Sequence, residues 1–251
     1  MTTSTLLQYL NDTYVDSGEG IVLEVGRDDR GPYIVLNQTI FYPQGGGQPS
    51  DTGCMEFNDL VINVSFVGFK DGQVLHYISE EPPALAELVG RTGKLRLDKS
   101  RRIKHARLHT AGHLIAGIID AERASMRATK GFHFEEGPYV EFEGEPQSDS
   151  ESLLATLQTK IDQLIAEDAP VTASLVSYDD LKQRCGSVPP NLPQDKPLRT
   201  ITIETLDPVP CGGTHLACLS ELGTVTVLKM KKRKGTTKIS YQVSASPGAL
   251  N

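Results

Sequence analysis

The sequence contains little of what marks a secreted or membrane-spanning protein. It has four cysteines and no tryptophan in 251 residues, and only 6% of its residues are aromatic. So few cysteines in a chain of this length do not form the disulfide framework of a small secreted domain. No apolar run approaches the roughly 20 residues of a membrane-spanning helix, and the first 19 residues lack the lysines and arginines of a signal peptide. These absences predict a globular cytoplasmic protein.

The negative charge of the chain is spread unevenly. The formal net charge is −7, but residues 1–90 carry −10 and residues 91–251 carry +3. Basic runs occur at 99–107 (KSRRIKHAR) and 229–234 (KMKKRK). Such clusters can hold phosphates even on an acidic protein, because salt screens each charge beyond about 10 Å. Two solvated surfaces explain the same pattern, so charge alone does not decide whether the partner is a nucleic acid.

The first ninety residues alternate short apolar runs with turns rich in Gly, Pro and Asp. Residues 80–91 (EEPPALAELVGR) contain two prolines and are typical of a connector. This pattern predicts an N-terminal domain over residues 1–92 that forms a small β-barrel. Four runs have the length and composition of its strands: 21–25, 33–36, 60–66 and 73–78.

From residue 98 onward the apolar period is that of helices. Asp98 or Ser100 can cap a helix with an apolar stripe over residues 103–118, and a second stripe covers 153–165. Residues 93–251 are therefore predicted to form an α+β domain with helices on one face of a mostly antiparallel sheet. Its expected strands are 171–177, 199–206, 223–229 and 236–244, the last two joined by a lysine-rich hairpin turn.

Two histidines in this first helix are candidates for metal binding. His109 and His113 are four residues apart, so both imidazoles lie on one face of a helix and can reach one ion. His105 lies one turn earlier on the same face, so helical geometry does not say which pair binds. Three surface histidines on a basic helix explain the motif equally well. A protease-type zinc motif is excluded, because no glutamate follows His109 as a general base.

A second candidate motif begins at Cys211 and ends at His215. Two glycines after the thiol let the backbone bend tightly, so that the thiol and the imidazole can point at one centre. A turn with an incidental cysteine is the alternative. Together with the helical histidines this loop supplies a set of nitrogen and sulfur ligands that suits tetrahedral Zn²⁺.

Three spaced segments of the sequence resemble a known family. They are FYPQGGGQPSDTG at 41–53, HTAGHL at 109–114 and CGGTHL at 211–216, with further similarity at 130–144 and 220–223. In this order they are similar to the motifs of alanyl-tRNA editing proteins, and the length matches their medium-length, free-standing AlaX type. The resemblance covers roughly residues 20–245.

The resemblance implies an activity and a cofactor. Members of this family hydrolyse the ester that joins tRNA(Ala) to a wrongly attached serine, and sometimes glycine. The resemblance makes His109, His113, Cys211 and His215 the ligands of zinc, and mischarged tRNA(Ala) the partner. Editing has a physical basis, because a pocket for alanine cannot strongly reject glycine or serine.

The resemblance leaves the mechanism and the substrate contacts open. Four protein ligands make a closed site, so zinc either activates water after losing or adding a ligand, or only positions the 3′-terminal adenosine. No catalytic residue is predicted beyond the zinc site. For each residue proposed to contact the substrate, a purely structural role in a loop or turn is an equally good interpretation. The proposed residues are Thr129 and His133 near the zinc, Thr214 between two ligands, and Gly45, Gly46 and Gly47 near the acceptor end.

Three other functions compete with the alanyl editing hypothesis. A threonyl-type editing domain shares the His/His and Cys/His arrangement, although the segment at 41–53 favours the alanyl type. A tRNA-binding module that keeps zinc only for folding would bind tRNA without releasing an amino acid. A zinc hydrolase of small esters would act without tRNA.

Overall fold

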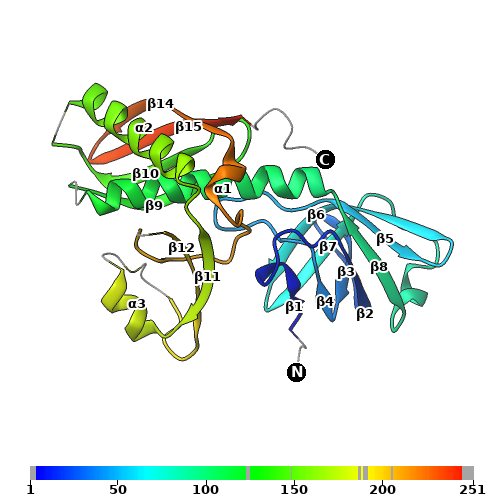
Figure 1. The fold of residues 1–251 in the computed structure, drawn as a ribbon. Coiled ribbons are helices and arrows are strands. Elements are labelled where there is room, and N and C mark those ends of the chain that lie inside the picture. The colour runs from blue at the N-terminus through cyan, green and yellow to red at the C-terminus, as the bar shows by residue number, and fades with distance from the viewer. Residues whose placement is uncertain are drawn as a thin grey trace. The chain divides into compact units, whose positions relative to one another are not determined.

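The computed structural model describes residues 4–122, 125–147, 149–185, 188, 192–204 and 206–244. The chain forms two compact units, Met1–His105 and Ala106–Asn251, each of which is described by itself. The predicted combination of helices with mostly antiparallel strands is confirmed (Figure 1). Among the described residues no helix is both long and apolar enough to cross a membrane.

The first unit is a closed barrel of six antiparallel strands, as predicted. The strand order around the barrel is β2-β3-β7-β6-β5-β8. Alternating side chains of these strands fill the interior, and the core includes Ile34, Met55, Val67 and Leu95. The strands are β2 (Ser17–Asp28), β3 (Gly31–Leu36), β5 (Gly53–Phe57), β6 (Leu60–Lys70), β7 (Gln73–Ile78) and β8 (Thr92–Leu97).

Two barrel strands, β5 and β8, fall outside the predicted set. The strand β8 pairs with both β2 and β5, so the barrel ends at Leu97 rather than at residue 92. The backbones of β5 and β8 approach so closely that a Cβ on Gly53 would lie 2.1 Å from the carbonyl oxygen of Arg96. These segments contain glycine and charged residues, which have low strand propensity, so the sequence did not predict them as strands. They form strands because of the neighbouring strands with which they pair.

The remaining elements of the first unit are short. The strand β1 (Leu6–Leu7) runs parallel to β4 (Gln38–Thr39), and two 3₁₀ turns follow at Gln8–Leu10 and Leu85–Leu88. Helix α1 (Lys99–Ala121) then begins, and the carboxylate of Asp98 accepts a hydrogen bond from the Arg101 N–H at 3.0 Å. The predicted cap at Asp98 is confirmed.

The basic run at 99–107 is solvated only in part, because its two lysines are exposed whereas two of its arginines are buried. The guanidinium of Arg102 is fully buried and pairs with Asp51. Arg107 is also buried, and its Nε donates to the backbone oxygen of Glu221 at 2.9 Å. These two arginines therefore have structural roles and are not free to contact phosphates.

A buried histidine lies inside the barrel. The Nδ1 of His76 contacts the carbonyl oxygen of Ile34 at 3.0 Å, and its Nε2 lies 2.7 Å from the hydroxyl of Thr39. The carbonyl only accepts, so Nδ1 carries the proton, and the Thr39 hydroxyl donates to Nε2 while it accepts from the Phe41 N–H. Burial lowers the pKa of His76 to about 4. The ring is therefore neutral at pH 7 and fully hydrogen-bonded.

The barrel should lose stability in mild acid because of this histidine. The unfolded chain takes up the proton near the ordinary pKa of 6.5, whereas the folded chain takes it up only near 4. The stabilisation is therefore present above pH 6.5 and is lost as the pH falls towards 4. We expect urea unfolding to show a loss of about 2 kcal/mol between pH 7 and pH 5 that the variant His76→Gln lacks. A difference between wild type and variant that stays constant with pH would contradict this account.

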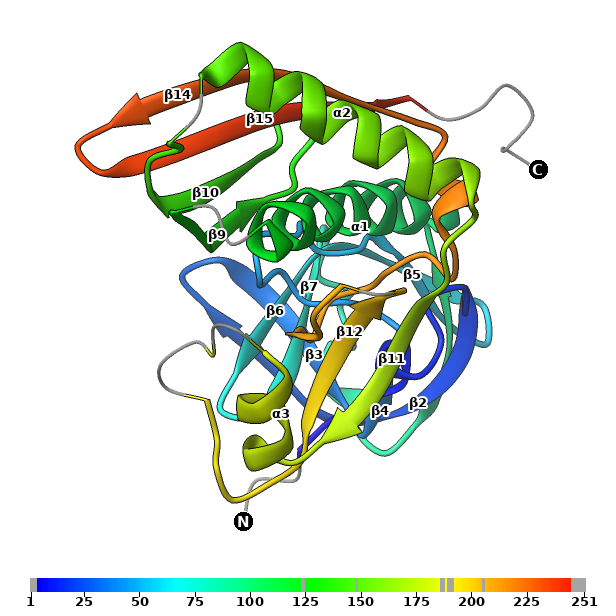
Figure 2. The same ribbon diagram turned by 60° about the vertical axis from the view of Figure 1, so that its left-hand side comes forward.

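The second unit contains a four-stranded antiparallel sheet with the order β14-β15-β10-β9. Helix α2 (Ser150–Ala166), capped by Asp149, hydrogen-bonds through Gln158 to the backbone of β14. Figure 2 shows α1 and α2 side by side along this sheet. The strands are β9 (Met126–Phe132), β10 (Tyr139–Gly144), β14 (Thr224–Arg233) and β15 (Thr236–Ser244).

The predicted lysine-rich hairpin joins β14 to β15. Arg233 pairs with Thr236, and the two residues between them, Lys234 and Gly235, both have positive φ, of 49° and 76°. This is the conformation of a type I′ turn, which suits the twist of a hairpin. The strand prediction at 236–244 is confirmed at both ends, whereas β9 and β10 were not predicted as strands.

A smaller sheet of three antiparallel strands completes the second unit. It contains β11 (Val171–Val176), β12 (Leu198–Ile203) and β13 (Val209–Pro210). Helix α3 (Tyr178–Arg184), which was not predicted, follows β11, and the 3₁₀ turn η3 (Leu219–Leu222) precedes β14. The short loop between β13 and η3 carries the second candidate motif.

Candidate metal centre

Helix α1 brings two of the predicted ligands together. His109 and His113 lie one turn apart, and the centroids of their rings are 4.9 Å apart. The structure groups this pair, and not His105, with Cys211 and His215. Of the two pairs that helical spacing left open, His109 and His113 are therefore the better candidates for metal binding.

The loop that carries Cys211 and His215 is held by Arg199 of β12. The backbone N–H of Cys211 donates to the Arg199 carbonyl at 3.0 Å. The Arg199 guanidinium donates in turn to the carbonyl oxygens of Cys211, at 2.7 Å, and of Gly213, at 3.0 Å. Three hydrogen bonds to one residue fix the backbone of the loop. Arg199 is thus a positioning residue, which the sequence analysis did not find.

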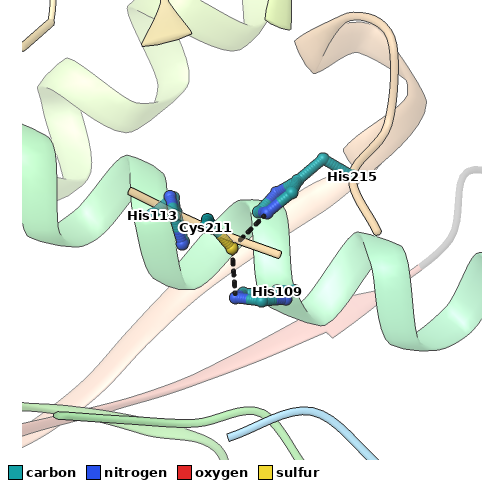
Figure 3. Close-up of side chains that lie close together, drawn as sticks. All are labelled: His109, His113, Cys211 and His215. Carbon is teal, nitrogen blue, oxygen red and sulfur yellow. Dashed lines mark hydrogen bonds between the residues drawn. The ribbon is translucent and has the colours of Figure 1, made fainter. Parts of the chain in front are cut away.

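The four side chains form a cluster that fits a tetrahedral metal ion (Figure 3). Their ligand atoms all lie within 4.8 Å of one another. The sulfur of Cys211 is 3.6 Å from the Nε2 of His109 and 3.3 Å from the Nε2 of His215. A tetrahedron with Zn–N near 2.0–2.1 Å and Zn–S near 2.3 Å requires N···S separations of roughly 3.5 Å. The spacing and the chemistry of the four donors both suit Zn²⁺.

Burial keeps the histidines of the cluster in the form that binds metal. It lowers the pKa of His113 to about 4 and the pKa values of His109 and His215 well below the ordinary value. Burial also raises the pKa of the Cys211 thiol to about 11, against the opposing effects of the Gly213 N–H and the Arg199 charge. The imidazoles are therefore neutral donors, and a bound cation is what would favour the thiolate in this buried site.

A threonine within the helical motif orients one of the histidines. The Thr110 hydroxyl is fully buried, lies 3.2 Å from the Nδ1 of His215 and accepts from the backbone N–H of Leu216 at 3.1 Å. With Nδ1 bonded to Thr110, the Nε2 of His215 faces the sulfur of Cys211. Groups that hold the second nitrogen of a ligand histidine in this way fix its tautomer. The only signal for this role in the sequence is that Thr110 directly follows the predicted ligand His109.

His133 is the one predicted substrate contact that lies beside the cluster. Its ring stacks on that of His109 with a centroid distance of 4.5 Å. Its Nδ1 is 2.8 Å from the hydroxyl of Tyr241, which donates to the carbonyl oxygen of Leu108 at 2.8 Å. The proton of His133 is therefore on Nδ1, and burial lowers the pKa of the ring to about 3.

Two glycines make room for the ring of His133. A Cβ on Gly112 of α1 or on Gly131 of β9 would lie about 2 Å from ring atoms of His133, at 2.2 Å and 2.1 Å. The glycine in the helical motif thus accommodates a fourth imidazole beside the three of the cluster. This packing fixes His133 against His109 from both sides.

The other predicted substrate contacts have different surroundings. Thr129 is exposed at a bulge of β9, and its hydroxyl donates to the Glu141 carbonyl at 3.2 Å. Thr214 is fully buried between the ligands Cys211 and His215. For Thr129 a role in holding the local backbone accounts for what the structure shows.

The three glycines of the barrel motif form an exposed turn. Gln48 and Gly45 exchange backbone hydrogen bonds, and Gly46 and Gly47 between them have φ of 52° and 78°. Positive φ at both positions explains two of the glycines. It does not explain Gly45, where a Cβ would meet nothing closer than 3.8 Å.

Comparisons with known proteins agree with the resemblance of the motifs. The sequence family described as tRNA synthetases class II (A) matches residues 16–101. The alanyl-tRNA editing protein AlaX-M of Methanosarcina barkeri is 29% identical over 93% of this chain and 96% of its own length. The alanyl-tRNA editing protein AlaX-L of Pyrococcus horikoshii is 30% identical, and the chain spans 56% of that longer relative.

A third relative shows the family directly. The alanyl-tRNA editing protein AlaX-M of Methanosarcina mazei is 31% identical, and the match covers 93% of this chain and 94% of that protein. A match of this length extends over both compact units of the chain. The chain therefore belongs to the family of alanyl-tRNA editing proteins.

Proposed function

We propose that the protein is a trans-editing hydrolase that deacylates mischarged tRNA(Ala) in the cytoplasm, releasing serine and, with lower preference, glycine. The observation that carries this proposal is the cluster of three histidines and one cysteine, two of them buried and two partly buried, in a member of this family. The cluster is proposed to hold Zn²⁺ through His109, His113, Cys211 and His215. The two compact units would then be the two domains, a tRNA-binding barrel and an editing domain.

The residues around the cluster suit a site that binds the end of the substrate. Zinc supplies a Lewis acid that can polarise an ester oxygen or a water molecule. The four ligands form a complete tetrahedral set, so we assign the cluster the placement of the 3′-terminal adenosine. Beside His113 a small recess is lined mainly by apolar residues, among them Gly117, Ile201 and Val209. We propose that this recess takes the side of the aminoacyl group that carries the hydroxymethyl group of serine, or only hydrogen in glycine.

The proposed substrate contacts differ in their support. His133 is the strongest candidate, because it stacks on His109 and is held in one orientation by Tyr241. Gly45 is exposed and has no steric reason to be glycine, so the lack of a side chain would let the acceptor end approach this turn closely. The N–H of Gly45 itself donates to the Gln48 carbonyl oxygen at 3.2 Å and would not contact the substrate. Thr129, Thr214, Gly46 and Gly47 remain candidates without support of this kind.

Release of labelled serine tests the proposal. We expect the zinc-loaded protein to release serine from Ser-tRNA(Ala) at least roughly 100-fold faster than alanine from Ala-tRNA(Ala), because the site must distinguish the hydroxyl group. Ser-tRNA(Ser) and Ser-tRNA(Thr) serve as controls for the tRNA. A folded, zinc-loaded protein that binds tRNA(Ala) but releases nothing would be a binding module. Preference for Ser-tRNA(Thr), or hydrolysis of small esters without tRNA, would replace the proposal by one of those alternatives.

A further inference from the structure

Among the described residues, helices α1 and α2 lie on one face of the four-stranded sheet, and the other face carries exposed and partly exposed side chains. Tyr241 of β15 points to the helix side, where its hydroxyl reaches the backbone of α1 at Leu108. Side chains alternate along a strand, so Lys238, three residues before Tyr241, points the other way, and residues paired with it in register share its face. Lys231, Glu141 and Lys130 follow from this pairing across β14, β10 and β9. We call this surface the open face.

Cations outnumber acids on the open face. The rows on either side of Lys238 add Lys229, which pairs with Ser240, and Arg233, which pairs with Thr236. Arg127 of β9 pairs with Glu143 at the end of the same row as Arg233. Six basic residues therefore share this face with two acids, Glu141 and Glu143, on a chain whose net charge is −7. Two of the six have protein partners: Lys238 pairs with Glu141 at 3.1 Å, and Arg127 reaches the Val188 carbonyl oxygen at 3.5 Å. All of the basic residues but Lys238 are exposed.

A column of three aromatic rings crosses the same face. Phe132 is central, with ring centroids 4.5 Å from Phe134 and 5.3 Å from Tyr139, and each neighbouring ring is tilted by 16°. The ammonium of Lys238 lies 4.3 Å from the centroid of the Tyr139 ring. All three rings are partly exposed, although apolar rings of this size usually lie in a core. Nearly parallel rings bordered by lysines form a surface on which flat, negatively charged polymers can bind.

We propose that the open face binds single-stranded RNA, with an unpaired base stacked on the aromatic column and phosphates held by the surrounding lysines. Unpaired bases stack on aromatic side chains whatever their sequence, while basic residues follow the backbone. A duplex hides its bases and would use only the charges. An acidic polypeptide would likewise use the lysines without the rings. The inference rests on the proposed function only in taking tRNA as the natural source of the unpaired segment.

Two variants separate the charge from the rings. Lys130→Glu/Lys231→Glu reverses two exposed charges, and Phe132→Leu removes the central ring but keeps an apolar side chain. The matched control, Lys182→Glu/Arg184→Glu, makes the same change of charge on the exposed side of α3. Fluorescence anisotropy measures the binding of a labelled 12-nucleotide single-stranded RNA at salt concentrations from roughly 50 to 200 mM. Binding through phosphate contacts weakens steeply over this range.

The expected results differ between the two variants. The charge variant should bind at least about tenfold more weakly and lose roughly 1.4 from the slope of log K against log salt, since each phosphate contact contributes about 0.7. Phe132→Leu should bind about fivefold or more weakly with an unchanged slope. The control should bind like wild type. Equal affinity in all proteins, or an equal loss in the control, would overturn the proposal. So would competition by polyglutamate that abolishes RNA binding together with wild-type affinity in Phe132→Leu, because the face would then bind any acidic polymer through charge alone.

Deacylation assays keep this inference distinct from the proposed function. The open-face variants should raise the KM for Ser-tRNA(Ala) and leave kcat near the wild-type value, whereas Cys211→Ser should abolish turnover and leave RNA affinity unchanged. Wild-type KM and RNA affinity in the open-face variants would refute the inference alone. If the protein binds RNA through the open face but releases no serine, the proposed function alone is refuted.

Discussion

Replacing Cys211 with serine should lower the affinity for zinc by more than roughly 100-fold and abolish the release of serine from Ser-tRNA(Ala). The sulfur of Cys211 lies within 3.6 Å of two imidazole nitrogens and is the one soft ligand of the cluster. Loss of a group that only supports a ligand typically costs 10- to 100-fold in metal affinity, so loss of a ligand should cost more. A chelator competition measures the affinity, and the thiolate absorption band of the Co²⁺-substituted protein should disappear.

Cys218 provides the matched control for this experiment. It is the cysteine nearest to the loop in sequence, but its sulfur lies beside Ser220 and Glu221, at 3.3 and 3.6 Å, and it does not belong to the cluster. Cys218→Ser should therefore keep zinc affinity, the cobalt spectrum and deacylation close to wild type. If Cys211→Ser behaves like Cys218→Ser, the metal centre is not the one assigned here.

Replacing Asp51 with asparagine should lower the free energy of unfolding by about 3–5 kcal/mol, the usual cost of leaving a buried charge unpaired. Asp51 and Arg102 are both fully buried, and the Nε of Arg102 lies 3.0 and 3.1 Å from the two carboxylate oxygens. The guanidinium also donates to the carbonyl oxygens of Thr13, at 2.9 Å, and Ile40, at 2.6 Å. The neutral amide would leave this positive charge in the interior without its partner.

An exposed ion pair of the same barrel serves as the control. Arg96 and Glu56 lie 2.9 Å apart, and their side chains are 63% and 30% exposed. Glu56→Gln should change the free energy of unfolding by less than about 1 kcal/mol, because water screens the pair. Urea unfolding of the three proteins at pH 7 compares the two pairs. A cost for Asp51→Asn no greater than that for Glu56→Gln would mean that the buried charge is neutralised by other groups.

The Asp51 pair also shows that the barrel motif has two kinds of residue. Asp51 accepts from the Tyr42 N–H at 2.7 Å, and Gln48 is fully buried, so both hold the segment in place. Gly45, in contrast, is exposed and has no steric need to be glycine. Substitution of the buried residues therefore reports on stability, and only the turn is a candidate for contact with the substrate.

Local patterns in the sequence were sufficient for the elements that are specified by neighbours along the chain. The apolar stripe and the cap at Asp98 predicted helix α1, and the lysine-rich turn with Gly235 predicted the hairpin of β14 and β15. The types and spacing of His109, His113, Cys211 and His215 predicted a set of metal ligands, because the preference of zinc for nitrogen and sulfur does not depend on the fold.

Contacts between distant segments were decided only by the tertiary structure. His105, His109 and His113 are equally spaced on one face of a helix, so only a loop about a hundred residues away could select the pair that joins the cluster. Arg102 stands in a run of basic residues that resembles a solvated surface, and its burial depends on a carboxylate about fifty residues earlier. The ring column of the open face likewise requires the register of β9 against β10.

The sequence could not predict these contacts because the burial and the pairing of a side chain depend on its neighbours in three dimensions. A local pattern fixes the conformation of a few residues, since hydrogen bonds of helices and turns close within a few positions. Whether a charge is solvated or paired, and whether an imidazole faces a thiol or water, depends on which distant segment packs against it. For this protein the sequence determined which side chains are candidate metal ligands, and the tertiary structure determined which of these candidates meet.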